Sequence, residues 1–151
     1  MDYVADFIKH IQNASAAIGK PLSEDSYDVI DRGLPHKPAG LPIGKMGIYT
    51  FLYKDRFLKI GKAGANSDAR FRSQHYGFNA QSTLAKSIVS DSEMLLLGIN
   101  ESNVGEWIKN NCRRIDILID SNVGIFTLEF IEGLLHYIYE PKYEGFKSQR
   151  K

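Results

Sequence analysis

The sequence predicts an α/β protein of the α+β kind, with helices flanking a small central antiparallel sheet. Two runs rich in β-branched and aromatic residues, separated by a short polar turn, indicate a β-hairpin over about residues 47–61. An apolar run over about residues 114–120 indicates a third, buried strand. The chain has 151 residues, of which 43% are hydrophobic and 25% charged, and this suits one compact domain with a core of its own.

Residues 1–45 are expected to form a helix and an extended connector. Apolar residues at helical spacing predict an amphipathic helix over roughly residues 2–18. Residues 34–44 hold three prolines and two glycines, which is typical of an extended connector that leads into the core. We therefore expect a single domain over residues 1–151, with its core over residues 46–146.

The hairpin is expected to turn at Lys54-Asp55-Arg56, where polar residues separate the two apolar runs. If the turn centres on Lys54, Tyr49 lies across from Lys59 and Phe51 lies across from Phe57. Tyr49 and Lys59 then share one face of the sheet.

Helical segments are expected before and after the third strand. Asn103 and Glu106 have the spacing of a capping box, and Pro141 stops the last helix. In that last helix the apolar residues form one arc, and Glu132 lies at its edge beside His136, where a carboxylate is held rigidly and still faces a cleft. The expected segments are residues 67–77, with Ser67 or Asp68 as the cap and Gly77 as the end, and residues 83–89, 103–111 and 127–139.

Cysteine usage and hydropathy exclude several classes of protein. The single Cys112 cannot form an internal disulfide, and together with the four histidines it shows no zinc-ligand spacing. The first residues are acidic where a secretory signal would be basic, and no apolar run approaches the length that spans a bilayer. We expect a soluble, cytoplasmic protein with no membrane partner.

Charge is distributed unevenly along a chain whose net charge is only +1. Between Lys45 and Tyr76 there are seven cations and two acids, and six aromatic residues are interleaved with them. This mixture suits contacts with phosphates and bases, and Lys62, Arg72, His75 and Tyr76 are the candidate nucleic-acid-binding residues. The competing interpretation is a solvated basic hairpin, with His75 as a packing partner within its own helix.

Short motifs occur in an informative order along the core. Gly47-Ile48-Tyr49 is followed by Lys59-Ile60-Gly61-Lys62, then by Arg70 on a short helix and Glu132 on a later one. In these residues the chain resembles the GIY-YIG nuclease superfamily, over roughly residues 46–146. The order of the motifs and the elements that carry them agree with the hairpin, helix, strand and helix of that family.

The resemblance implies a metal-dependent endonuclease that acts on DNA, with Tyr49, Lys59, Arg70 and Glu132 as catalytic residues. Glu132 would bind Mg²⁺ (or Mn²⁺), with waters and phosphate oxygens completing the octahedron. Arg70 would clamp the phosphate through its planar fork. Tyr49 would act as general base or position the attacking water. Since a free tyrosine titrates at about pH 10, the first role needs nearby cations, which Lys59 and Lys62 can supply.

The sequence departs from the family pattern at three places. Lys59 stands where the second motif has a tyrosine, as in some restriction-enzyme-like branches of the family. Pro141 has the expected spacing, but Glu144 stands where an asparagine is common. A longer loop sets Arg70 eleven positions after Lys59, which makes Arg72 a rival for the catalytic arginine. We favour Arg70.

Simpler interpretations stay open for each residue and for the whole chain. Tyr49 suits a half-buried sheet aromatic, Lys59 a soluble strand edge, and Glu132 an ion pair with His136 one turn later. The chain can also be a non-catalytic nucleic-acid-binding module on the same fold, or a structural or partner-binding protein that uses the helix of residues 2–18. For a nuclease, DNA is favoured over RNA, and a homodimer or a partner protein would supply specificity.

Overall fold

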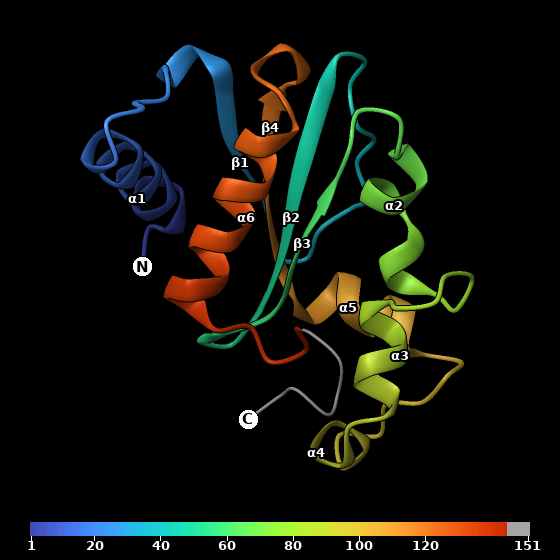
Figure 1. Ribbon diagram of the computed structural model, residues 1–151. Coiled ribbons are helices and arrows are strands. Elements are labelled where there is room, and N and C mark those ends of the chain that lie inside the picture. The colour runs from blue at the N-terminus through green and yellow to red at the C-terminus, as the bar shows by residue number, and fades with distance from the viewer. Residues whose placement is uncertain (145–151) are drawn as a thin grey trace.

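The computed structural model describes residues 1–144 and shows a four-stranded antiparallel sheet with helices on both faces (Figure 1). This confirms the predicted fold class. The strand order is β1-β4-β2-β3, so the last strand along the chain lies between the first two. The predicted end of the core at residue 146 lies outside the described residues.

The strands are β1 (Tyr27–Gly33), β2 (Lys45–Tyr53), β3 (Arg56–Ala63) and β4 (Arg113–Asp120). The helices are α1 (Tyr3–Ala17), α2 (Asp68–Arg72), α3 (Leu84–Val89), α4 (Ser92–Leu95), α5 (Val104–Asn111) and α6 (Ile125–Tyr139), with short 3-10 turns η1 (Glu24–Ser26), η2 (Gln74–Tyr76) and η3 (Ser121–Val123).

Each face of the sheet carries its own hydrophobic core. Helices α1 and α6 cover one face, and α2, α3 and α5 cover the other (Figure 1). Successive side chains of β2 alternate between the two, with Ile48 in the α1–α6 core and Tyr49 and Phe51 in the opposite one. Because both faces are covered, β2 is buried continuously from Met46 to Leu52.

Strand β1 corrects the expectation for residues 1–45, in which only a helix and a connector were predicted. The helix is present as α1, but the segment after it pairs antiparallel with β4 and forms one edge of the sheet. Most of its residues are only partly buried, and charged side chains interrupt the apolar alternation, which hides the strand from arguments based on periodicity. The charged residues are Asp28, Asp31 and Arg32.

The hairpin has the predicted turn but a different register. The observed pairs are Tyr49–Gly61 and Phe51–Lys59, where the sequence predicted Tyr49–Lys59 and Phe51–Phe57. The cause is an extra residue in β3, Leu58, at which the register shifts. The bulge turns Leu58 into the core of α2, α3 and α5. Tyr49 and Lys59 stay on the same face, but as diagonal neighbours instead of direct partners.

The predicted helices are present with altered ends. Helix α6 begins at Ile125, and Glu140 ends it in the left-handed conformation, with φ of 44°. The segment predicted over residues 67–77 is divided into α2 and η2. Asn103 precedes α5 but does not form the capping box, because its amide bonds to the preceding turn instead. Helix α4 was not predicted. Within residues 1–144 no helix is long and apolar enough to cross a lipid bilayer.

The segment after α6 covers the outer edge of β3. The Lys142 N–H donates to the Phe57 carbonyl at 3.0 Å, and the Tyr143 N–H donates to the Leu58 carbonyl at 2.9 Å. An edge strand otherwise leaves such groups unpaired. This segment therefore lies beside the strand that carries the second motif.

Candidate active site

Side chains from four separate elements gather around the β3 edge of the sheet. Tyr49 comes from β2, Arg70 from α2, Glu132 from α6, and Glu144 from the segment that follows α6. Arg70 interacts with the other three. A hydrogen bond with Tyr49 raises the pKa of Arg70, and the charges of Glu132 and Glu144 raise it further. The fold thus brings a hydroxyl, a guanidinium and two carboxylates together.

Gly61 makes room for the Tyr49 ring. A Cβ atom at Gly61 would lie 2.5 Å from two ring carbons of Tyr49, which no real contact allows. The glycine of the second motif is therefore required by close approach. Burial raises the pKa of the Tyr49 hydroxyl, and the hydrogen bond with Arg70 opposes this rise without cancelling it. Near pH 7 Tyr49 is therefore a neutral hydroxyl.

Gly47 likewise makes room for a neighbouring aromatic ring, the Phe71 ring of α2. A Cβ atom at Gly47 would lie 2.5 Å from a ring carbon of Phe71, whose side chain is fully buried. This close contact sets the rotation of α2 against the sheet. Arg70 and Arg72, which flank Phe71, then leave the helix in different directions.

Only Arg70 of these two arginines interacts with Tyr49. The Nε of Arg72 lies 3.5 Å from the carboxylate of Asp68, four residues earlier. Its guanidinium also packs against Gly40 of the connector, so closely that a Cβ atom at Gly40 would collide with it. Arg72 therefore faces the connector, whereas Arg70 lies beside Tyr49.

Glu132 is paired with Lys62, not with His136. The Lys62 Nζ lies 3.2 Å from the Glu132 Oε1, and the Glu132 side chain is 16% exposed. The His136 Nε2 instead donates to the Ile60 carbonyl at 2.7 Å. Lys62 is therefore paired with the candidate metal ligand. Its ammonium group can contact a phosphate only after the ion pair with Glu132 breaks.

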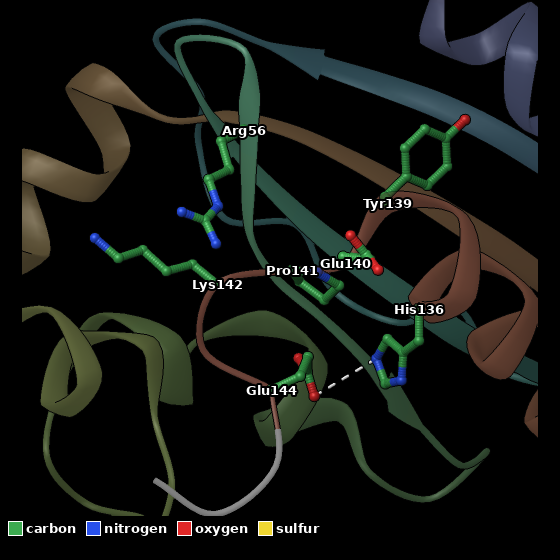
Figure 2. A pocket seen from close by; sticks show the side chains of 7 residues that line it. All are labelled: Arg56, His136, Tyr139, Glu140, Pro141, Lys142 and Glu144. Carbon is green, nitrogen blue, oxygen red and sulfur yellow. Dashed lines mark ion pairs between the residues drawn. The ribbon is translucent and has the colours of Figure 1, made fainter. Parts of the chain in front are cut away.

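Glu144 lies beside the same strand and against His136 (Figure 2). The Ile60 N–H donates to Glu144 Oε1 at 3.1 Å, and the His136 Nε2 lies 3.5 Å from Glu144 Oε2. Burial raises the pKa of Glu144, and the charge of Glu132 adds to this rise, while His136 and Lys59 oppose it. Lys59 is buried as well. Glu144 was not among the predicted catalytic residues, because it stands where the family pattern commonly has an asparagine.

A cavity of about 510 Å³ adjoins Glu144 and His136 (Figure 2). Arg56, at the start of β3, and Lys142 also line it. Lys142 is engaged, because its Nζ lies 2.7 Å from carboxylate oxygens of both Asp91 and Glu93. Arg56 is exposed and has no ion pair within residues 1–144. Arg56 is therefore the cation of this cavity that is placed to meet an incoming anion.

His75 is buried and Tyr76 is partly buried, and each makes a hydrogen bond within the fold, which corrects the expectation that both are open binding residues for nucleic acid. His75 is 3% exposed, and its Nε2 donates to the Phe71 carbonyl at 2.8 Å. Burial lowers the pKa of His75 to about 3, so its ring is neutral. The Tyr76 hydroxyl accepts from Arg114 at 2.9 Å and lies 2.8 Å from the His36 Nε2. The local contact with Phe71, weighed as the alternative for His75, is the one observed.

A buried charge network beneath α2 was missed by the sequence reasoning. Arg114 and Asp116 on β4 are both fully buried, with the Arg114 Nε 2.8 Å from the Asp116 Oδ1. Arg114 also donates to the carbonyls of Phe71 and Arg72, at 2.7 and 3.4 Å, at the end of α2. Arg114 is therefore a positioning residue for the helix that carries Arg70. The available signal was two opposite charges, two positions apart, inside an apolar strand.

The basic segment from Lys45 to Tyr76 is less cationic in the fold than in the sequence. Within residues 1–144, ion pairs engage Lys45 with Asp120, Lys62 with Glu132 and Arg72 with Asp68, and Lys59 is buried. The net attraction for nucleic acid must then come chiefly from the other cations.

Carboxylate oxygens are the donors that this site offers to a metal ion. Within the described part of the chain no three His, Cys, Asp or Glu side chains gather as a complete protein metal site. Mg²⁺ is commonly held by one or two carboxylates, with waters and phosphate oxygens in the remaining positions. Glu132, beside the charge of Glu144, fits such an ion through its donor chemistry.

Comparisons of this chain with protein-family models, with curated proteins and with solved structures return no match.

Proposed function

We propose that this chain is a metal-dependent endonuclease of the GIY-YIG kind that hydrolyses phosphodiester bonds, with DNA as the favoured substrate. The convergence of Tyr49, Arg70 and Glu132 at one edge of the sheet carries the proposal. Phosphodiester hydrolysis needs a positioned nucleophile and stabilisation of the charge that develops on the phosphate. A hydroxyl, a guanidinium and a carboxylate supply these needs together.

Each residue has a distinct role in the proposed reaction. Arg70 binds non-bridging phosphate oxygens through its planar fork. The neutral Tyr49 hydroxyl, held over Gly61, orients the attacking water. Glu132 would hold Mg²⁺, which when bound neutralises phosphate charge and lowers the pKa of a coordinated water. Lys59, whose charge acts on Glu144, adds positive potential to the site. Lys62 must release Glu132 as the metal and the substrate bind.

A non-catalytic nucleic-acid-binding module is the second candidate. The Lys62–Glu132 ion pair favours it, because a carboxylate that is already neutralised needs no metal. The two candidates differ in what happens to the substrate. A binder retards DNA in a gel and leaves it whole, whereas a nuclease converts it to shorter products.

The first experiment incubates the protein with plasmid, single-stranded DNA and RNA, with and without Mg²⁺ or Mn²⁺. We expect metal-dependent cleavage of DNA, and RNA to be cut more slowly. Binding to all three without cleavage under any metal would favour the binding module. Size-exclusion chromatography with and without DNA tests whether a homodimer supplies specificity.

The second experiment compares variants that differ only in position on one helix. Glu132→Gln should abolish metal-dependent cleavage, whereas Glu129→Gln, at an exposed position of α6, should cleave like the wild type. Cleavage by Glu132→Gln at the wild-type rate would remove Glu132 from the site. Circular dichroism of both variants checks that the helix is intact.

The third experiment separates the two arginines in single-turnover cleavage. We expect Arg70→Ala to slow the chemical step by roughly a hundredfold or more, the scale seen when a preorganised charge-stabilising group is removed. Arg72→Ala should keep a near-normal rate, because its side chain faces Asp68 and the connector. A large loss confined to Arg72→Ala would transfer the role to Arg72.

The proposed setting is the cytoplasm. The one cysteine, Cys112, is a buried free thiol, which is in keeping with a reducing compartment. A partner protein is the alternative to a homodimer as the source of target specificity.

A further inference from the structure

A second, smaller cleft opens directly beside the reacting groups. Its volume is about 200 Å³, and it lies between Tyr49 on β2, Arg70 and His75 of the α2–η2 segment, and the loop of residues 80–83. Because Tyr49 and Arg70 line both this cleft and the candidate site, its occupant is adjacent to the phosphate that Arg70 holds. None of the roles given above uses the rest of this cleft.

The side chains of Gln74, Gln81 and Ser82 are the polar groups of the cleft that have no role so far. Neither amide has a hydrogen-bond partner within residues 1–144, although each offers both donors and an acceptor. The Thr83 hydroxyl, in contrast, is used within the fold, since it donates to the Gly77 carbonyl at 2.7 Å and accepts from the Lys86 N–H at 3.1 Å. The two glutamines, whose amides offer donors and an acceptor side by side, are therefore better suited than the single hydroxyl of Ser82 to recognise the edge of a ligand.

The charge and aromatic character of the lining define the class of ligand. Arg70 is the one ionised side chain of the lining, and no carboxylate lines the cleft. The rings of Tyr49 and His75 lie together with centroids 4.1 Å apart, and His75 is neutral because burial lowers its pKa to about 3. Both rings are nearly fully buried, at 2% and 3% exposed, so they supply an uncharged wall and not an open stacking face. A small cleft with an uncharged wall and amide groups suits an uncharged ring with donors and acceptors on its edge.

The size of the cleft limits the ligand further. Pockets for drug-sized ligands are usually about 300–1,000 Å³, so a cleft of about 200 Å³ accepts a smaller fragment. A single nucleobase meets the limits of size, shape and polarity, whereas a base pair is too large. Enzymes that take one base from a strand read it by hydrogen bonds to its edge and by contact with aromatic rings.

The walls of the cleft are held in place before any ligand arrives. The Lys86 Nζ donates to the Ala80 carbonyl, and Thr83 ties the end of the loop to the start of α3. His75 is held by the Phe71 carbonyl. A preorganised pocket of this kind favours a specific ligand over an incidental one.

We propose that this cleft receives one nucleobase of the substrate strand, from a nucleotide next to the phosphodiester at Arg70, and that the amides of Gln74 and Gln81 recognise it. The proposal rests on the proposed function for the identity of the strand. It assigns to the chain a base-reading subsite that adjoins the groups that act on the phosphate. A glutamine amide matches the edge of adenine in two hydrogen bonds, so adenine is the favoured occupant.

The first test uses cleavage. Oligonucleotides carry an abasic residue at each position around the mapped cut in turn, and kcat/KM is measured for each. We expect one position at which loss of the base lowers kcat/KM by roughly ten- to a hundredfold. Gln74→Ala/Gln81→Ala should lose this discrimination. Asn79→Ala, in the same loop but outside the lining, is the matched control and should keep it.

The second test uses binding and needs no cleavage. ¹⁵N-labelled protein is titrated with each of the four deoxynucleoside monophosphates and with deoxyribose 5-phosphate, and the side-chain amide signals of Gln74 and Gln81 are followed. We expect shifts with the nucleotides, largest for the adenine nucleotide, and no shifts with the sugar phosphate. Equal shifts with the sugar phosphate would show that the cleft binds phosphate alone, and this would overturn the proposal.

The two tests separate failure of the subsite from failure of the nuclease. Cleavage that no abasic position affects, without base-dependent shifts, overturns the subsite and leaves the nuclease standing. Base-dependent shifts in a protein that cuts nothing support recognition of a base and count against the nuclease. Base-dependent shifts together with cleavage that ignores every abasic position would mean that the cleft binds a free nucleotide, which overturns its assignment to the strand.

Discussion

Replacement of Arg114 by methionine tests the buried charge network that holds α2. Arg114 makes hydrogen bonds of 2.8 Å to Asp116, 2.9 Å to the Tyr76 hydroxyl and 2.7 Å to the Phe71 carbonyl. Methionine is of similar length and makes none of them, so the Phe71 carbonyl and the Tyr76 hydroxyl lose a donor. Asp116 keeps only Arg32, whose Nε lies 3.0 Å from its Oδ2. Loss of one partner from a buried ion pair costs about 3–5 kcal/mol. This is a large part of the roughly 5–15 kcal/mol that stabilises a domain.

The preceding residue supplies a matched control for this measurement. The Arg113 Nε lies 3.1 and 3.2 Å from the two carboxylate oxygens of Asp31, but the Arg113 side chain is 29% exposed. Solvent-exposed pairs contribute about 0–1 kcal/mol, so Arg113→Met should cost far less than Arg114→Met. Both variants change arginine to methionine on the same strand, so the difference between them isolates burial and the hydrogen-bond network.

Urea unfolding at pH 7, followed by circular dichroism, measures the free energy of unfolding of both variants. A second comparison uses Arg114→Met/Asp116→Leu, which removes both buried charges and leaves Arg32, 21% exposed, to be solvated. This double variant should be more stable than Arg114→Met alone. Equal losses for Arg113→Met and Arg114→Met would refute the argument, because burial would then have no effect. A double variant less stable than Arg114→Met would show that packing, and not charge, dominates the network.

Three further predictions address the site and its surroundings. Gly61→Ala forces the Tyr49 ring from its place, so we expect a stability loss of about 1–3 kcal/mol in urea unfolding and a much lower cleavage rate; an unchanged rate would contradict the close-approach argument. The pKa of His75 is lowered to about 3 in the fold, below that of the unfolded chain, so the unfolded chain takes up the proton first and stability falls as pH drops below about 6.5. His75→Gln should reduce this fall by up to about 1.4 kcal/mol per pH unit, measured as the difference between wild-type and variant unfolding at pH 6 and 4.5; identical slopes would show that His75 is not buried as a neutral group. Arg56→Ala should reduce the log-log salt dependence of DNA binding by about one unit if Arg56 meets a phosphate, while Lys9→Ala on α1 should leave it unchanged. Fluorescence anisotropy at a series of salt concentrations measures that slope, and equal slopes in the two variants would remove Arg56 from the binding surface.

Local pattern was sufficient to determine the main elements of this protein. Apolar patterning and clear stop signals mark the hairpin, the buried strand β4 and helices α1 and α6. Such signals act within a few residues of the chain. The candidate set of Tyr49, Arg70 and Glu132 was likewise visible as spaced motifs. Its placement on a strand and two helices followed from the same signals.

Tertiary packing decided what the local signals left open. Strand β1 forms because β4 offers a partner edge, and the hairpin register is set by a bulge at Leu58 that the turn alone does not indicate. The choice between Arg70 and Arg72 depends on the rotation of α2, which the Phe71 ring over Gly47 imposes. The donors of Arg114 reach the end of α2 across a long stretch of sequence. These outcomes depend on contacts between segments that are distant in the sequence. The local spacing of residue types does not indicate such contacts.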